Sequence, residues 1–547
     1  MNKKYIVGGL VFWAGLSGYM GLRILESYTE DAVFAALSAV PAQAQEIRYS
    51  FLNNTLSLKG VEYELPDDKI MHKGTIESVE VTGFNRKCMF VKPNMPAYDP
   101  DALPIVAESV TATGIVDNVH VGHTRVEQRV GEAQLRGWHQ RLGMLLDQHS
   151  QHNGEASFFE ELYRCRLDGM ELRNVAAVIS EPGMQPVRLE AAGFELPKGV
   201  RAPRGTEKVS PVSVRISGVR FAGGNFSGSL QQLDLEDVLL PGPAVSAEFL
   251  RLSREAEASD PEAMAGSVGN ALPDRLLALM AKNYEDRVPV AGTAMQGGVF
   301  TMWNASGSGK SREPSLSVSL KSLNHALSMT EKGSFKTTTT LSGLNVKLPD
   351  FMGSNAVISR YAPDGLTLNM TGDALAGDTE LSGKVRYELE GLGVLEGDLD
   401  VSGDIRALRK ASMEGVPDDV LEGLMEGLRL GRLNLIYRDS GLVPMGMELA
   451  ARWKFENPEA FLRNAVAVLK ALEQSPERPV QELCRALGEQ LSMPGEFSMS
   501  IAPKQPMSFA EALALASVDP DALPVTFASK PGTKALKDYL QPGNEHE

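Results

Sequence analysis

Hydrophobic and polar residues alternate with a period of two along much of the chain. The clearest runs cover residues 47–51, 212–216, 316–320, 344–348, 366–370, 385–389 and 401–405. Because successive side chains of a strand point to opposite sides of its sheet, this alternation predicts strands with one apolar and one polar face. Such strands are typical of antiparallel sheets. The pattern therefore predicts a protein that is rich in antiparallel β-structure.

The alternation changes phase at Gly60, after which Val61, Tyr63 and Leu65 occupy the apolar positions. A β-bulge explains such a change, and Gly accepts the backbone angles of a bulge at little cost. A tetrapeptide motif recurs at residues 58–61, 172–175, 235–238 and 341–344. Its first and last residues are apolar, its second is polar, and its third is Gly, Asn or Asp. The intervals are irregular, which excludes a solenoid of fixed period. We interpret the motif as a strand feature that is used repeatedly along an elongated sheet.

Apolar residues at helical spacing predict helices in several regions, two of which are near residues 158–163 and 272–286. Val130, Trp138, Leu142 and Leu145 predict an amphipathic helix over residues 126–148. Near the C-terminus, two apolar stripes at residues 461–472 and 480–491 predict a pair of helices. Pro476 and Pro479 interrupt the chain between these stripes, so the two helices are separate.

The N-terminal segment is the longest apolar run. Residues 5–22 carry no formal charge and follow Lys3 and Lys4. At a rise of 1.5 Å per residue, such a helix just spans a bilayer core, and the preceding lysines favour a cytoplasmic N-terminus. A cleaved signal peptide is the main alternative, with Ala42-Gln43-Ala44 as the cleavage site, and a buried helix of a soluble protein is the third. We favour the uncleaved anchor, because cleavage sites usually follow the apolar run much more closely.

These patterns together predict a β-rich α+β protein. Its expected parts are an N-terminal transmembrane helix, an elongated and largely antiparallel sheet with helical insertions, and a helical C-terminal segment. The expected divisions are residues 1–25 as the anchor, 26–46 as a linker helix, 47–200 and 201–410 as β-rich domains, the first with a helical insert, and 411–547 as a mixed, mainly helical region. The Pro-rich and basic stretch at residues 197–211 is the expected boundary between the two β-rich domains.

Composition limits the classes of function. The 547 residues are 43% hydrophobic and 23% charged, which excludes wholesale disorder. The 70 Asp and Glu outnumber the 54 Lys and Arg, and no long basic cluster is present, so we expect no binding to nucleic acid. Three cysteines are too few for a disulfide framework or a four-sulfur metal site. Cys88 and Cys165 are able to pair in an oxidising compartment, whereas Cys484 lies on an apolar helix face and is expected to be a buried free thiol.

The clustered histidines are the strongest candidate for a metal site. Five of the eight histidines fall within 33 residues: His120, His123, His139, His149 and His152, with Asp147 among them. A metal site needs several converging ligands, and neither an H-E-x-x-H nor a C-x-x-C motif is present. We therefore favour solvated or locally bonded histidines over a metal site.

Other candidate motifs lack their structural context. Residues 307–311 resemble the end of a phosphate-binding loop, but Asn304 stands where the motif has Gly, and Pro314 leads into a strand pattern instead of a helix. Asp418 and Asp419 follow Pro417, as is typical of a helix start, and no G-x-S-x-G elbow is present. The sequence thus predicts no catalytic, cofactor-binding or metal-binding residue, no cofactor and no enzymatic activity.

The layout of the chain resembles a known family. Lys3-Lys4 and the apolar run are followed by the linker, by Ile47-Arg48-Tyr49-Ser50, and by Leu56-Ser57-Leu58-Lys59-Gly60-Val61. The alternating segment 366–405, the stretch 435–443 and the paired helices follow in the same order. This layout, over about two thirds of the chain, resembles AsmA-like and YdgA-like envelope proteins of Gram-negative bacteria. The resemblance implies an inner-membrane anchor, a periplasmic body and a long β-groove that holds or passes lipids, and it assigns no role to any individual residue.

Three hypotheses follow from the residues and the resemblance. The first is a non-enzymatic periplasmic envelope protein, anchored in the inner membrane, that binds or passes phospholipid along an apolar β-groove. The second is a structural or interaction scaffold of the envelope whose apolar strand faces form a closed core. The third is a periplasmic metal-dependent enzyme that uses the region from His120 to His152. An open row of apolar side chains favours the first hypothesis over the second.

Overall fold

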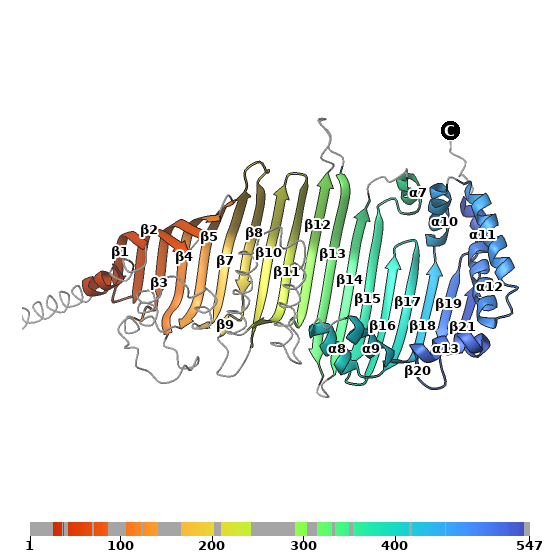
Figure 1. Cartoon of the computed structure of the whole chain (residues 1–547). Coiled ribbons are helices and arrows are strands. Elements are labelled where there is room, and N and C mark those ends of the chain that lie inside the picture. The colour runs from red at the N-terminus through yellow and green to blue at the C-terminus, as the bar shows by residue number, and fades with distance from the viewer. Residues whose placement is uncertain are drawn as a thin grey trace, which may run out of the picture. The chain divides into compact units, whose positions relative to one another are not determined.

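The computed structural model describes residues 26–34, 37, 42–67, 70–85, 105–121, 124–139, 166–201, 209–241, 290–303, 314–330, 334–348, 354–414, 418–454 and 456–540. The chain forms two compact units, of which the first comprises chiefly Met1–Gly224 and the second chiefly Val290–Glu547. Both units are built on open antiparallel sheet, and most of the helices that the structure describes are in the second (Figure 1). The predicted β-rich class with helices is confirmed at this level.

In the first unit, strands that are neighbours in sequence pair with one another. The main strands are β1 (Ala42–Ser50), β2 (Thr55–Asp67), β3 (Ile70–Thr82), β4 (Ile105–Val121), β5 (Thr124–His139), β7 (Gly169–Ser180), β8 (Val187–Leu196) and β10 (Val209–Gly223). Each pairs antiparallel with the next strand in this list. Two short strands, β6 (Arg166–Leu167) and β9 (Val200–Arg201), pair with each other, and β11 (Phe226–Pro241) follows β10.

A helix over residues 26–34 lies against β1. Val33 on this helix packs in one core cluster with Tyr49 and Leu56. The carboxylate of Glu30 accepts a hydrogen bond from the backbone N–H of Tyr49 at 2.7 Å, and Glu26 accepts one from Phe51 at 2.9 Å. An edge strand presents unpaired backbone donors, and these carboxylates satisfy two donors at and just beyond the end of β1.

The recurring tetrapeptide marks a kink in the strands. Gly60, Asn174, Asp237 and Gly343 have φ values of 57°, 53°, 46° and 61°, so the third residue of each motif has a left-handed backbone, and the motif is a strand feature that recurs, as predicted. At Gly60 the pairing continues without an inserted residue, from Lys59 opposite Ser78 to Val61 opposite Ile76. The partner strand therefore changes phase at the same level, and Leu58 and Val61 both stay in the core. At Gly343 the register with the following strand does shift, as in an ordinary bulge.

The predicted helix over residues 126–148 is wrong where the structure describes it, because Thr124–His139 forms β5. Apolar residues of β5 that pair with apolar residues of β4 are Val126, Val130, Ala133, Leu135 and Trp138. The strand changes phase near Gly131 and again at Gly137, where φ is 57°. Two changes of phase convert a period of two into intervals of two to four residues, which resemble helical spacing. Residues 140–148 and the predicted helices near 158–163 and 272–286 lie outside the described part of the chain.

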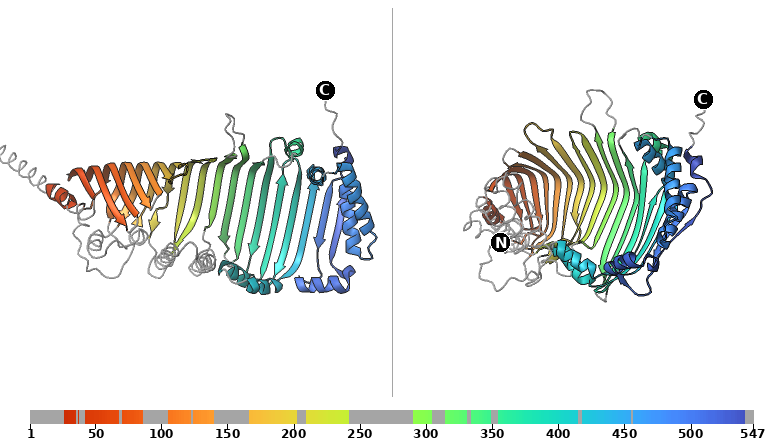
Figure 2. Two further views of the ribbon diagram at one scale, coloured as in Figure 1. Left: turned by 45° about the horizontal axis from the view of Figure 1, so that its top comes forward. Right: turned by 45° about the vertical axis from the view of Figure 1, so that its right-hand side comes forward.

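The second unit has an up-and-down arrangement of its own strands. Its strands are β12 (Gly292–Trp303), β13 (Pro314–Met329), β14 (Phe335–Lys347), β15 (Leu366–Ala376), β16 (Glu380–Leu389), β17 (Gly393–Ser402), β18 (Arg429–Asp439), β19 (Glu496–Ile501) and β21 (Val525–Lys530). Each pairs antiparallel with the next, and the short β20 (Met507–Ser508) pairs with β18. Figure 2 shows that β13–β18 bend along their length.

The helices of the second unit lie at the strand ends and beside the last strands. Those in the described part of the chain are α7 (Ser354–Tyr361), α8 (Ile405–Glu414), α9 (Asp418–Glu426), α10 (Leu442–Trp453), α11 (Pro458–Leu472), α12 (Arg478–Ser492), α13 (Phe509–Val518) and α14 (Leu536–Leu540). Helices α7 and α10 lie at one end of the strands, α8, α9 and α13 at the other, and α11 and α12 beside β21 (Figures 1 and 2). The predicted helices over 461–472 and 480–491 are confirmed as α11 and α12. The run at 401–405 is not all strand, because β17 ends at Ser402 and α8 begins at Ile405.

Several predictions concern residues near the N-terminus. The proposed anchor, residues 5–22, lies outside the described residues, and among the described helices none is both long and apolar enough to cross a membrane. The predicted linker helix does not reach residue 46, because β1 begins at Ala42. Ala42 and Ala44 of the alternative cleavage site pair with Tyr63 and Val61 of β2. Cleavage after Ala44 would therefore remove the first residues of a paired strand.

Candidate functional site

The register of the second unit brings the apolar strand positions together on one side of the sheet. Met370, Tyr387, Leu395, Tyr437 and Phe497 lie directly opposite one another in successive strands. Directly opposed residues of antiparallel strands point to the same face. The parallel rows on this side complete what we call the apolar face: Leu316, Val318, Leu323, Leu341, Leu344, Val346, Leu366, Leu368, Met370, Val385, Tyr387, Leu389, Leu395, Leu399, Leu433, Leu435, Tyr437, Phe497, Met499 and Ile501.

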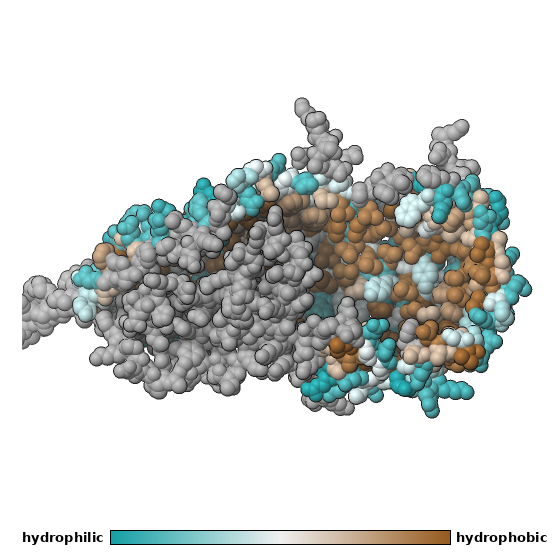
Figure 3. All heavy atoms as spheres, in the orientation of Figure 1, coloured by the Kyte–Doolittle hydropathy of each residue, from teal (hydrophilic) through white to brown (hydrophobic). Residues whose placement is uncertain are grey.

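The apolar face is open to solvent. Tyr387 and Leu395, on the central strands β16 and β17, are 39% and 38% exposed, and the other members are half-buried. By contrast, Leu392, in the turn between these strands, is 1% exposed and packs with Val357 and Met445 of α7 and α10. Figure 3 shows hydrophobic side chains gathered over the second unit, with polar groups along the rim. Among the described elements, the helices thus cover the strand ends and the last strands of this face, and they leave the middle of β16 and β17 open.

The opposite face of the same strands carries a ladder of ion pairs. Arg386 on β16 pairs with Glu396 on β17, and Arg438 on β18 contacts Glu396 at 2.9 Å. Arg438 also contacts Glu496 on β19 at 3.0 Å, and Lys530 on β21 contacts Glu496 at 2.6 Å. Arg438 and then Arg386 lower the pKa of Glu396, and Lys530 and Arg438 lower that of Glu496. The two faces therefore differ sharply, because one is charged and internally paired and the other is apolar and half-exposed.

The histidine cluster does not form a site within the described part of the chain. His120 lies opposite Arg125 at the start of β5, whereas His139 lies at the end of that strand, about 45 Å away at the rise of an extended strand. His139 instead lies 3.6 Å from Asp168. His123, His149 and His152 are outside the described residues. No group of three or more His, Cys, Asp or Glu that could hold a metal ion occurs among the residues described.

Two further predictions concern a phosphate-binding loop and the cysteines. A strand, β13, follows the Gly-Ser-Gly-Lys-Ser stretch, as predicted, so a helix N-terminus for phosphate does not follow it. Cys484 is a buried free thiol on α12, as predicted, and Cys88 and Cys165 lie outside the described residues. Alternation identified the apolar strands, but it did not single out Tyr387 or Leu395, because their common row depends on the register between strands.

Comparison with known proteins identifies one matching family and no activity. A family model described as "Uncharacterized protein" matches residues 386–530, about a quarter of the chain. The matched part runs from β16 to β21 and contains α10, α11 and α12. No match was found among curated proteins. The chain is therefore similar, over its C-terminal strands and helices, to a family whose description names no activity.

Proposed function

We propose that the protein binds lipid acyl chains along the apolar face of its second unit, as a non-enzymatic factor of the bacterial envelope. The single observation that carries this proposal is the half-exposure of Tyr387 and Leu395 in the middle of the sheet. Leaving apolar area in water costs about 25 cal/mol per Å², and large contiguous patches mark binding surfaces. An occupant of this face recovers that free energy.

The chemistry of the face favours hydrocarbon over a polar ligand. Its members offer aliphatic and aromatic carbon, and the charged groups of the same strands lie on the opposite face, where they pair with one another. A long row of apolar side chains across several strands matches an extended chain better than a compact molecule. The uncharged segment at residues 5–22, which we propose as an inner-membrane anchor with the body in the periplasm, would keep the sheet close to a supply of lipid. The layout shared with AsmA-like proteins supports the same assignment.

Photo-crosslinking at two neighbouring positions tests the proposal. A photoreactive phenylalanine derivative replaces either Leu395, on the apolar face, or Val394, which lies opposite Arg438 on the charged face. Cells that make the full chain are irradiated, and adducts are identified by mass spectrometry. We expect phospholipid adducts at position 395 and few at position 394.

The comparison of the two positions is its own control. They lie next to each other on one strand, so expression and membrane proximity are the same for both. Equal lipid adducts at 394 and 395, or none at either, would count against the proposal. Adducts to protein at position 395 would instead favour the scaffold hypothesis, in which the face is covered by a partner.

A further inference from the structure

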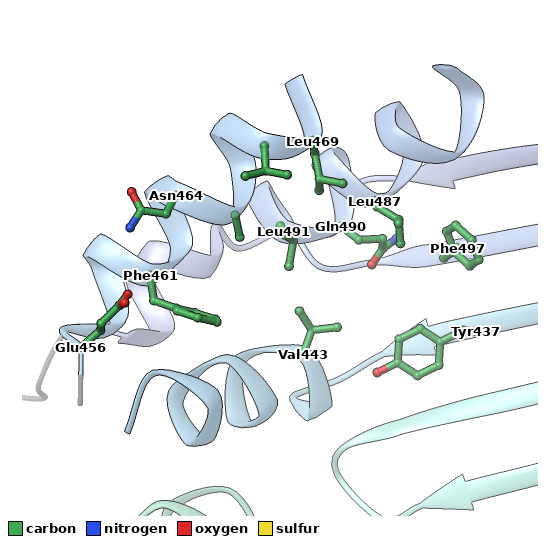
Figure 4. Close-up of a pocket in the computed structure, with 12 residues that line it drawn as sticks. Tyr437, Val443, Glu456, Phe461, Asn464, Leu469, Leu487, Gln490, Leu491 and Phe497 are labelled. Carbon is green, nitrogen blue, oxygen red and sulfur yellow. The ribbon is translucent and has the colours of Figure 1, made fainter. Parts of the chain in front are cut away.

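A cavity lies where α10, α11 and α12 meet the last strands, and it shares only Tyr437 and Phe497 with the apolar face. Its volume is about 700 Å³, which is within the range of sites for small molecules. Phe461 and Leu469 of α11 and Leu487 and Leu491 of α12 line it, and Tyr437 and Phe497 of the sheet lie at one end (Figure 4). Ala465 of α11 is a further lining residue. Part of each helix stripe predicted from the sequence therefore lines this cavity.

Hydrogen bonds within the protein hold the walls in place. The side chain of Asn457 accepts from the backbone N–H groups of Glu459 and Ala460, at 2.9 and 3.3 Å, and so begins α11. Gln490 of α12 donates to Ser529 Oγ of β21 at 3.2 Å and accepts from the backbone N–H of Gly495 at 3.0 Å. These contacts fix α12 against the sheet, so the cavity is a feature of the packed structure.

The polar groups in the interior of the cavity are already engaged. Tyr437 donates its hydroxyl to Asp439 at 2.6 Å, and burial, together with this carboxylate, raises the pKa of the phenol. The amide of Gln490 has partners at both its oxygen and its nitrogen. A ligand in the interior would therefore have to be one that needs no hydrogen bonds, because a buried polar group without a partner is costly.

Polar side chains with room for a ligand lie at the other end. Glu456 and Asn464 are exposed and lie together at the end away from Tyr437 and Phe497 (Figure 4). Among the described residues that line the cavity, Glu456 is the one acidic residue, and none of the others is basic. A carboxylate placed there would meet a like charge, whereas a head group with a cationic part would meet an opposite charge.

We propose that this cavity binds one linear acyl chain of a phospholipid with a zwitterionic head group, which remains at the end formed by Glu456 and Asn464. The chain enters between α11 and α12 and extends toward Tyr437 and Phe497. The inference depends on the cavity alone, so it does not require that lipid also covers the apolar face. It assigns a single-chain site to the part of the protein that the family model matches.

Photolabelling of the full chain, purified in amphipol, tests this site. The probe is palmitoyl lysophosphatidylcholine with a diazirine at the end of its chain, and labelled peptides are mapped by mass spectrometry. We expect labelling within residues 437–497. Ala465→Trp places an indole in the cavity, and each methylene that it excludes lowers affinity about fourfold, so labelling should fall by at least about tenfold.

Matched variants separate the site from general hydrophobic binding. Ala467→Trp adds the same indole to an exposed position of α11 outside the cavity and should change labelling by less than about twofold. Leu487→Glu places a charge at a half-exposed wall position and should lower labelling by at least about tenfold, without added bulk. Labelling that both Ala465→Trp and Leu487→Glu leave unchanged would overturn the proposal.

The head group is tested with diazirine-bearing palmitate. Wild-type protein should be labelled more weakly by palmitate than by the lysophospholipid, and Glu456→Gln should reduce the difference by at least about threefold. Equal labelling by the two probes in the wild type would overturn the assignment to a zwitterionic lipid. Lipid adducts at position 395 test binding on the apolar face, whereas labelling within residues 437–497 tests binding in the cavity. A negative result in one experiment is therefore distinguishable from a negative result in the other.

Discussion

Two leucines near the β16–β17 turn provide a test of whether the apolar face is open. Leu392 is 1% exposed and packs with Val357, Ala362 and Met445. Replacing it with alanine removes buried carbon and leaves a cavity beneath α7 and α10. We expect Leu392→Ala to lower the free energy of unfolding of the second unit by about 3–4 kcal/mol, as is usual for fully buried leucines.

The same substitution at Leu395 should cost much less. Leu395 is 38% exposed, so roughly six tenths of its area is removed from water. Three carbon groups at about 0.8 kcal/mol each, scaled by that fraction, give about 1.5 kcal/mol, which is an upper bound for a real unfolded chain. No cavity forms, because solvent reaches the site. The expected loss for Leu395→Ala is therefore about 1–1.5 kcal/mol.

Hydrogen–deuterium exchange of peptides from β17 measures both values. In the regime where exchange reports the opening equilibrium, Leu392→Ala should speed the slowest amides by about 150–900-fold and Leu395→Ala by about 5–13-fold. Exchange is preferable to a single unfolding curve, because a chain with two units is not expected to unfold in one step. A loss of about 3 kcal/mol or more at Leu395 would show that this residue lies in a closed core and would refute the open-face reasoning.

Three further predictions concern other features of the second unit. Gly343→Ala should destabilise β14 by about 1–2 kcal/mol, because φ at this position is 61° and an added Cβ would lie 2.9 Å from Lys321 Cβ. The same exchange assay measures this loss, and unchanged exchange in β14 would contradict the reasoning. Arg438→Met should lower thermal stability at neutral pH and have less effect below about pH 4.5. Since Arg438 lowers the pKa of Glu396 in the folded state, its contribution is present while the carboxylate is ionised and is lost as the pH falls, and an equal loss at both pH values would contradict the reasoning. Cys484, 6% exposed, should resist iodoacetamide in the native protein and react after urea unfolding, as measured by peptide mapping, and fast native labelling would show that α12 opens readily.

The wrong sequence-based predictions have a common physical cause. Two changes of phase in β5 made its apolar residues resemble a helical stripe, because a kink shifts every later side chain to the other face. The change of phase at Gly60 is visible in the sequence of β2. That β3 changes phase at the same level, so that no residue is inserted, depends on how the two strands pair. The linker was extended too far as a helix, because Ala42–Ser50 is held as strand by its pairing with β2.

The sequence by itself determined most strands of the second unit, the irregularity of the strand at Gly60, and which sides of α11 and α12 are apolar. These properties follow from residue spacing and local backbone preference, which act over a few neighbours. Only the tertiary structure decided that Tyr387 and Leu395 stand in one exposed row, and that the stripes of α11 and α12 enclose a cavity beside Tyr437. The exposed row depends on the register between strands, and the cavity depends on how closely the helices approach the sheet. The alternation of apolar and polar residues is the same whether the apolar face is open or closed in a core.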